Sequence, residues 1–240
     1  MNHSTISKTI IVFAATFGLP VAGLAQGEMV VDFGGGEPGG YIKLLLLFAS
    51  LSLAPAVLAV TTSFARIVVV LFFLRAGLGA SEIPPTVVLI GLAIFLTVFT
   101  MAPQLNGIYG QAVTPYLAGD IEAGDAISNI EGPLREYMTA RTRQADIDVF
   151  TAIRPSEADR PAVTTLVPAF VLSELRAAFL IGLIIYLPFF VIDVVVGATI
   201  ASVGLLGLPV PALSLPFKVL LFVMVDGWAL LAGSLLGSMA

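Results

Sequence analysis

The sequence feature that most constrains the fold is an uncharged run over residues 44–65, in which no Asp, Glu, Lys or Arg occurs. A helix of this length extends about 33 Å at about 1.5 Å per residue, enough to cross a hydrocarbon core of about 30 Å. Three further apolar runs follow, over residues 86–102, 177–202 and 219–238. Charged residues make up 11% of the chain, against roughly 25% in a soluble domain. The sequence therefore predicts an all-α, polytopic membrane protein.

The four runs are close enough in sequence to pair as two helical hairpins. Pro55 lies inside the first run and predicts a kink there, because a proline leaves one helix carbonyl without its donor. The first hairpin is expected over residues 44–102, with helices over 44–65 and 86–102. The second is expected over residues 176–240, with helices over 177–202 and 219–238.

A polar segment, residues 103–175, separates the hairpins and contains charges, Gly and Pro throughout. Apolar side chains recur in it at roughly helical intervals, which predicts an amphipathic helix that ends before Pro155. These side chains are Leu134, Tyr137, Met138, Ala145 and Val149. The segment is predicted to be exterior to the bilayer and partly helical.

The N-terminal residues have the three parts of a signal peptide. Lys8 precedes a short apolar run over residues 10–19, and small residues lead up to Ala25. This pattern predicts a signal peptide over residues 1–25, cleaved after Ala25, and a flexible Gly-rich leader over residues 26–43. The alternative is a short first membrane helix, for which the apolar run is too short to span comfortably.

Ionisable residues beside or inside the apolar runs are candidate functional groups. A carboxylate placed in such a run costs at least about 2.5 kcal/mol on insertion scales, so it should face protein or water. Asp193 and Asp226 are in this position. We interpret them as assembly contacts or cavity-lining groups, because no intramembrane His or Lys is expected beside them; a proton relay is the alternative. The full candidate set comprises Arg66, Arg75, Glu174, Arg176, Asp193, Lys218 and Asp226.

Several function classes lack the residues they require. The chain has no Cys, and its one His lies in the predicted signal peptide, so a catalytic or metal-binding constellation would need carboxylates alone. No P-loop or dinucleotide-binding fingerprint occurs, which predicts a protein that is not an enzyme and holds no cofactor. The net charge of -5 argues against a nucleic-acid partner, which requires clustered Lys and Arg.

Four separated blocks of the sequence resemble one known family. The blocks are residues 62–70 with Leu74 and Arg75, Pro84 and Pro85 with residues 91–97, residues 168–175, and residues 215–218 with 225–228. In these residues and in their order the chain resembles the FliP family, the P subunits of the flagellar type III protein-export gate.

The resemblance implies an assembly. Several copies of such a chain, expected to be five, build with Q and R subunits a helical pore that passes unfolded flagellar proteins across the bacterial inner membrane. The assembly would lie in the flagellar basal body, in contact with membrane lipid. Its surroundings of protein and water would tolerate the charged residues within the apolar runs.

In many relatives a methionine cluster in the loop between the last two helices is thought to seal the pore. The matching positions in this sequence are Leu205, Leu206 and Gly207, and with Leu208 they form the candidate pore gate. Composition and periodicity alone lead only to a polytopic membrane protein. They leave open an ion- or proton-coupled transporter subunit and a passive membrane scaffold.

Overall fold

The computed structural model describes residues 52–53, 55–80, 83–153, 162–205 and 207–239. All of these except Ser52 belong to one compact unit, Leu53–Ala240. Every regular element within them is a helix, which confirms the predicted all-α fold. The predicted signal peptide, the leader and Ala25 lie outside the described residues.

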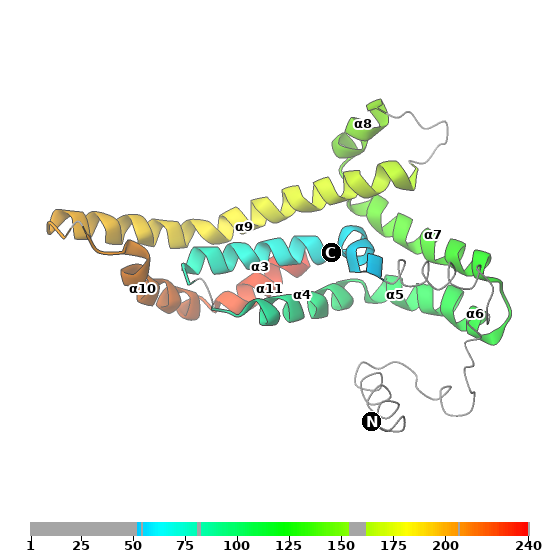
Figure 1. Cartoon of the computed structure of the whole chain (residues 1–240), viewed down its shortest axis with the longest axis horizontal. Coiled ribbons are helices and arrows are strands. Elements are labelled where there is room, and N and C mark those ends of the chain that lie inside the picture. The colour runs from blue at the N-terminus through cyan, green and yellow to red at the C-terminus, as the bar shows by residue number, and fades with distance from the viewer. Residues whose placement is uncertain (1–51, 54, 81–82, 154–161, 206, 240) are drawn as a thin grey trace, which may run out of the picture. The chain divides into compact units, whose positions relative to one another are not determined.

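Two helices, α3 (Phe64–Leu78) and α9 (Val163–Ser202), lie side by side and form the centre of this unit (Figure 1). The buried positions of α3 recur at helical spacing and form one apolar stripe. Glycines allow the two helices to approach closely, because an added Cβ at Gly182 would lie 2.5 Å from the Phe73 ring and one at Gly77 would lie 2.6 Å from the Phe189 ring. The buried stripe of α3 is Ile67, Val70, Leu71, Leu74 and Leu78.

The first described bend was not predicted. A short helix, Pro55–Thr61, meets α3 at an angle of 85°, so the chain breaks at Thr62 and Ser63; the residue before Pro55 lies outside the described residues, and the kink expected at Pro55 stays a prediction. The hydroxyls of Thr61 and Thr62 donate to the carbonyls of residues 57 and 58, at 2.8 and 2.6 Å, and so compete with the backbone donors that would continue the helix. The predicted helix over residues 44–65 is therefore wrong at its end, since α3 begins at Phe64.

The second apolar run, expected as a helix over residues 86–102, contains α4 (Thr86–Thr100), but the chain does not turn back after it. A bend of 67° at Met101 leads into α5 (Ala102–Ile108), where Pro103 occupies the first turn. Proline is tolerated at that position because the N–H of a first-turn residue, which proline lacks, would have no acceptor within the helix. The polar segment thus starts as a bent extension of α4.

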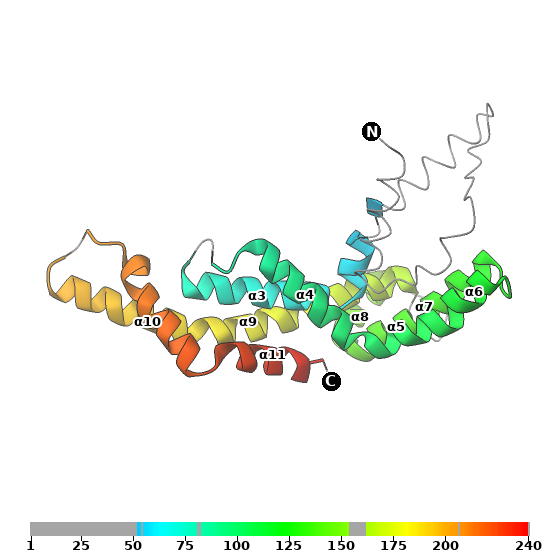
Figure 2. The same cartoon turned by 90° about the horizontal axis from the view of Figure 1, so that it is seen from below.

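The polar segment consists of α5, the π-helical turn η2 (Tyr109–Val113), α6 (Thr114–Ala118), α7 (Ala123–Arg141) and α8 (Gln144–Ile153) (Figure 2). Helix α7 packs against α5, η2 and α6, and α8 packs against α9. Pro115 has no N–H, which leaves the carbonyl of Gln111 without its helical donor. The side-chain amide of Asn129 on α7 donates to that carbonyl at 2.9 Å and so links α7 to η2. The single amphipathic helix predicted for this segment is two helices, because the chain turns between Arg141 and Gln144.

The second hairpin also differs from its predicted bounds. Helix α9 begins at Val163, so the predicted boundary at residue 176 lies inside it. The last run, expected as one helix over residues 219–238, is α10 (Val210–Met224) followed by α11 (Gly227–Gly237) at an angle of 65°. Asp226 makes this bend with φ 50° and ψ 55°, a left-handed conformation that Asp adopts more readily than most residues.

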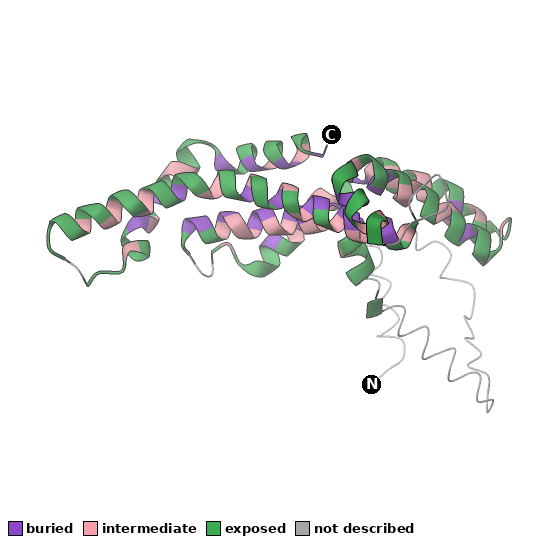
Figure 3. Ribbon diagram, turned by 90° about the horizontal axis from the view of Figure 1, so that it is seen from above, coloured by how far each residue is buried: buried purple, intermediate pink, exposed green. Residues whose placement is uncertain are grey.

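The described residues contain one helix, α9, that is long and apolar enough to cross a membrane, or up to four spans if each bent pair counts as one. Many of the large apolar side chains in this unit are exposed rather than buried (Figure 3). Such an exterior suits lipid or other protein chains and not water. The all-α membrane fold predicted from the sequence is confirmed.

Candidate functional site

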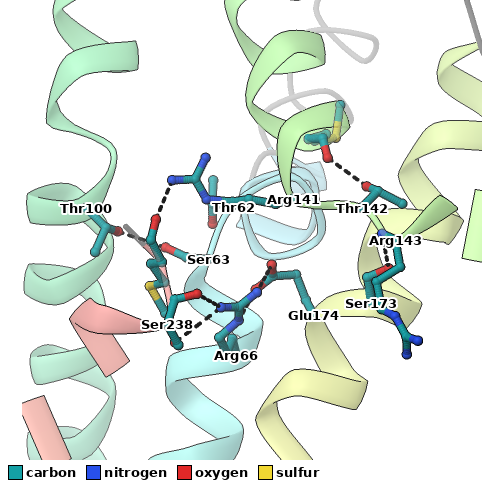
Figure 4. A network of polar contacts seen from close by, with 12 residues as sticks. Thr62, Ser63, Arg66, Thr100, Arg141, Thr142, Arg143, Ser173, Glu174 and Ser238 are labelled. Atoms are coloured by element: carbon teal, nitrogen blue, oxygen red, sulfur yellow. Dashed lines mark hydrogen bonds and ion pairs between the residues drawn. The ribbon is translucent and has the colours of Figure 1, made fainter. Parts of the chain in front are cut away.

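A buried ion pair joins the two central helices. Arg66 of α3 donates from Nε and Nη2 to the two carboxylate oxygens of Glu174 on α9, at 2.7 and 2.5 Å (Figure 4). Both side chains are almost fully enclosed, at 6% and 1% exposed. A guanidinium facing a carboxylate with two parallel bonds is the strongest and most directional of the protein ion pairs. The pair fixes the register of α3 against α9.

The end of α11 meets this ion pair. Arg66 Nη1 also donates to the backbone carbonyl of Ser238 at 2.8 Å, and Arg141 at the end of α7 donates from Nη2 to the carbonyl of Met239 at 2.7 Å (Figure 4). The guanidinium of Arg141 lies 4.1 Å from the centre of the Tyr137 ring. Two arginines from different helices therefore hold adjacent carbonyls. We call Arg66, Glu174, Arg141 and the segment Ser238–Met239 the polar junction.

Two helix bends border the polar junction. Ser63, at the first bend, shares a hydrogen bond of 2.9 Å with Thr100, which ends α4 just before the second bend (Figure 4). Tyr137 packs edge-on against Phe170 of α9 and is buried. Burial raises the pKa of the Tyr137 phenol above its usual value, because the ionised form would lose its hydration. The phenol therefore stays neutral.

A second polar cluster holds α8 against α9. Ser173 donates to the buried carboxylate of Asp146 at 2.6 Å, and the backbone N–H of Arg143 donates to the Ser173 hydroxyl at 3.1 Å. Arg176 donates to the other Asp146 oxygen at 3.0 Å. The hydrogen bond from Ser173 lowers the pKa of Asp146, with a further lowering from Arg176, and burial only partly opposes this. Asp146 therefore remains ionised and anchors α8.

A second ion pair lies further along α9. Lys218 of α10 donates to Asp193 at 2.7 Å, and Ser214 donates to the other oxygen of the same carboxylate at 2.5 Å. The lysine is 1% exposed and the carboxylate side chain 27%. Lys218 was expected at the start of its helix, but it lies in the interior of α10, which begins at Val210. The expectation that no lysine accompanies Asp193 is therefore wrong.

The remaining sequence candidates are not drawn into these clusters. Arg75 donates to the Thr86 hydroxyl at 2.7 Å and lies over the Phe72 ring, 4.6 Å from its centre. Asp226 is exposed at the bend between α10 and α11, and its side chain does not cap α11. In the loop before α10, Leu205 and Leu208 are half exposed, and Leu206 lies outside the described residues.

Several residues of these clusters were not predicted from the sequence. Arg141, Asp146, Ser173, Ser214 and Ser238 lie in a polar helix or are short hydroxyl residues that occur in any membrane helix. Ser214 and Lys218, spaced i and i+4, share one helix face with each other, and this spacing was the one available signal. Within the part of the chain that the structure describes, no group of three or more His, Asp or Glu side chains is placed to hold a metal ion.

Comparison with known proteins gives a consistent result over nearly the whole described unit. A model of the FliP family matches residues 47–235. The flagellar biosynthetic protein FliP of Bacillus subtilis strain 168 is 44% identical over 220 residues, which cover 88% of this chain and 99% of that protein. The FliP of Caulobacter vibrioides is 39% identical, and the match covers 92% of this chain and 85% of that protein. The FliP of Pectobacterium carotovorum is 44% identical, and the match covers 81% of this chain and 77% of that protein. The chain belongs to the FliP family.

Proposed function

We propose that this chain is a core subunit of the flagellar type III protein-export gate. As a FliP family member it is a membrane-associated component of the flagellar export apparatus. In the proposal, copies of the chain assemble with Q and R subunits in the bacterial inner membrane and enclose a helical pore. Unfolded flagellar proteins pass through that pore.

The family match carries the proposal, and the exterior of the helical unit supports it. Large apolar side chains are exposed along α4, α9 and α10, among them Phe95, Leu183, Phe190 and Phe217. The charged residues of the same helices, in contrast, have partners within the chain: Glu174 pairs with Arg66, Asp193 with Lys218, and the more exposed Arg176 with Asp146. A subunit with an apolar exterior and internally satisfied charges can pack against lipid and against further helical subunits.

In this proposal the gate is the loop between α9 and α10, with Leu205, Leu206, Gly207 and Leu208. Gly204 ends α9 with φ 80°, where glycine is the residue of choice, and Pro209 precedes α10. A ring of leucines from several copies would exclude water, since narrow apolar constrictions close by dewetting. The ion pair between Asp193 and Lys218 would hold the two helix arms that carry this loop.

The proposal is tested in a strain that lacks the gene. The wild-type chain should restore motility and secretion of filament protein, and it should copurify from membranes with the Q and R subunits. Leu205→Ser with Leu206→Ser should still assemble but make the membrane leak small ions, whereas Leu230→Ser, an exposed leucine on α11, should not. Normal secretion by the deletion strain would rule out the export function and favour a passive scaffold.

One observation favours an ion-coupled transporter as the second candidate, namely the Asp193–Lys218 pair in apolar helices. The transporter hypothesis predicts that the Asp193→Asn variant assembles fully and loses only ion-driven transport. The export-gate proposal predicts that the same variant reduces assembly or accumulation, because the carboxylate has a structural partner. Native gels combined with a secretion assay separate the two.

A further inference from the structure

Helix α11 is bound weakly along its length. Its buried residues form one narrow stripe, Gly227, Leu231 and Leu235, while Trp228 and Leu230 are 45% and 58% exposed. Gly233 lies on its open side, where an added Cβ would meet nothing within 4 Å. A helix with so little buried surface gains little from packing, so its attachment depends on its two ends.

One end of α11 is a hinge. Asp226 has a positive φ of 50°, and its side chain makes no capping hydrogen bond to the first turn of α11. Gly227 follows directly beneath the Phe222 ring, where a Cβ would lie 2.2 Å from ring atoms. A left-handed residue that is not glycine costs free energy in this position. The bend is thus a single strained residue between two regular helices.

The other end of α11 is held by side chains from outside the helix. The last carbonyls of a helix have no intrahelical donor and need other partners. The carbonyl of Leu235 accepts from the Ser238 hydroxyl at 2.7 Å, and the carbonyls of Ser238 and Met239 accept from Arg66 and Arg141. The cationic donors also suit the negative end of the helix dipole. Met239 is 5% exposed and packs in the main core.

The two arginines come from parts of the unit that are otherwise distinct. Arg66 lies on α3 in the apolar core, and its guanidinium is already engaged by Glu174. Arg141 lies at the end of α7 in the polar segment, where stacking on the Tyr137 ring orients it. The segment Ser238–Met239 therefore accepts one hydrogen bond from the apolar core and one from the polar segment.

We propose that Arg141 and Arg66 form a clasp on Ser238–Met239, and that α11 is a strap which the clasp holds closed and which opens about Asp226 and Gly227 while α3 and α9 stay packed. Movement of α7 would withdraw Arg141 and release the strap, so the clasp links the polar segment to α10 through α11. This inference concerns the fold of one chain and does not depend on the proposed export function.

The sequence has no cysteine, so single thiols can report on the clasp. Leu235→Cys places a thiol on the buried face of α11, at a position 0% exposed, and Leu166→Cys places one at an equally buried position of α9. Leu230→Cys, on the exposed face of α11, is the reference that gives the labelling rate of an accessible thiol. Each is made in the full-length chain, purified in detergent and treated with a maleimide.

Adding Arg141→Ala should raise the labelling rate at Leu235→Cys about tenfold or more, toward the rate at Leu230→Cys, because a charge-assisted hydrogen bond is lost. Leu166→Cys should stay protected. Arg143→Ala is the matched control, since Arg143 is exposed and its one hydrogen bond described above is from its backbone N–H to Ser173 of α9, which the substitution keeps. An unchanged rate at Leu235→Cys would overturn the clasp. So would an equal rise at Leu166→Cys, or the same rise with Arg143→Ala, because either shows general loosening rather than release of a strap.

Discussion

Two of the ion pairs of helix α9, those of Glu174 and Asp193, differ in how completely they are enclosed. Glu174 and Arg66 are both nearly inaccessible and share two parallel bonds, whereas Asp193 keeps 27% of its side chain exposed beside a buried Lys218. A guanidinium is a planar fork that holds a carboxylate through two parallel bonds, so the first pair has one stable arrangement. A lysine ammonium is a point charge on a flexible stem, so the second pair can rearrange. The comparison indicates that one end of α9 is fixed and the other is adjustable.

The surroundings of the two pairs agree with this difference. Around Arg66 and Glu174 lie the ends of α7 and α11, held by hydrogen bonds from Arg66 and Arg141, and the two bends, which the bond between Ser63 and Thr100 links to each other. Around Asp193 and Lys218 lie the α9–α10 hairpin, which ends in the loop that we propose as the gate, and Gly79 at the end of α3, which is close to the lysine ammonium. A gate that opens needs an adjustable support, and a subunit that assembles needs a fixed one.

The largest effect is expected at the enclosed pair. Glu174→Gln should lower the free energy of unfolding by about 3–5 kcal/mol, because Arg66 stays charged and buried without its counter-charge. Thermal unfolding of the purified protein measures this. The control is Glu131→Gln, which breaks an exposed pair with Arg135 on α7 and should cost less than about 1 kcal/mol. Equal losses in the two variants would contradict the assignment of the pair as a fixed point.

A packing variant tests whether the contact between α3 and α9 is as rigid as the comparison assumes. Gly182→Ala, between the two pairs on α9, should cost about 1–3 kcal/mol, since its Cβ would lie 2.5 Å from Cδ2 and 3.0 Å from Cβ of Phe73. The Cβ atom of Phe73 is bonded to the backbone, so it cannot move unless the backbone of α3 moves too. Gly233→Ala, with nothing within 4 Å, should be neutral or slightly stabilising. A neutral Gly182→Ala would mean that α3 can shift along α9.

The smallest effect is expected at the open pair. Asp193→Asn should cost less than Glu174→Gln, about 1–2 kcal/mol, because the carboxylate side chain is 27% exposed and its surroundings can replace part of the lost charge interaction with Lys218. The measurement is the same unfolding transition, so the ratio to Glu174→Gln is read directly. A loss at Asp193 as large as that at Glu174 would show that both ends of α9 are fixed, and the comparison would fail.

Much of the fold was predictable because helix formation in apolar runs depends on local sequence. The runs over residues 86–102 and 177–202 contain α4 and most of α9. The positions of the helix bends could not be predicted from the local sequence. The break at Thr62 and Ser63 was not expected, because threonine hydroxyls compete for carbonyls only where the surrounding helices allow the turn.

The candidate site was predicted in its members but not in its pairing. Arg66, Glu174, Asp193 and Lys218 were selected because charges in apolar helices need partners. Nothing in the spacing connects Arg66 to Glu174, which lie 108 positions apart. Arg141 had no signal at all, since a charged residue in a polar helix is ordinarily solvated.

By itself, the sequence determined that this chain is helical, that it belongs to a membrane, and that it carries the motif blocks of its family. These are properties of hydrophobicity and of residue order, which act along the chain. Only the tertiary structure decided that two arginines from α3 and α7 meet the end of α11, and that one ion pair of α9 is closed while the other is open to its surroundings. Those features depend on which helices pack together, because burial and pairing are set by neighbours distant in sequence.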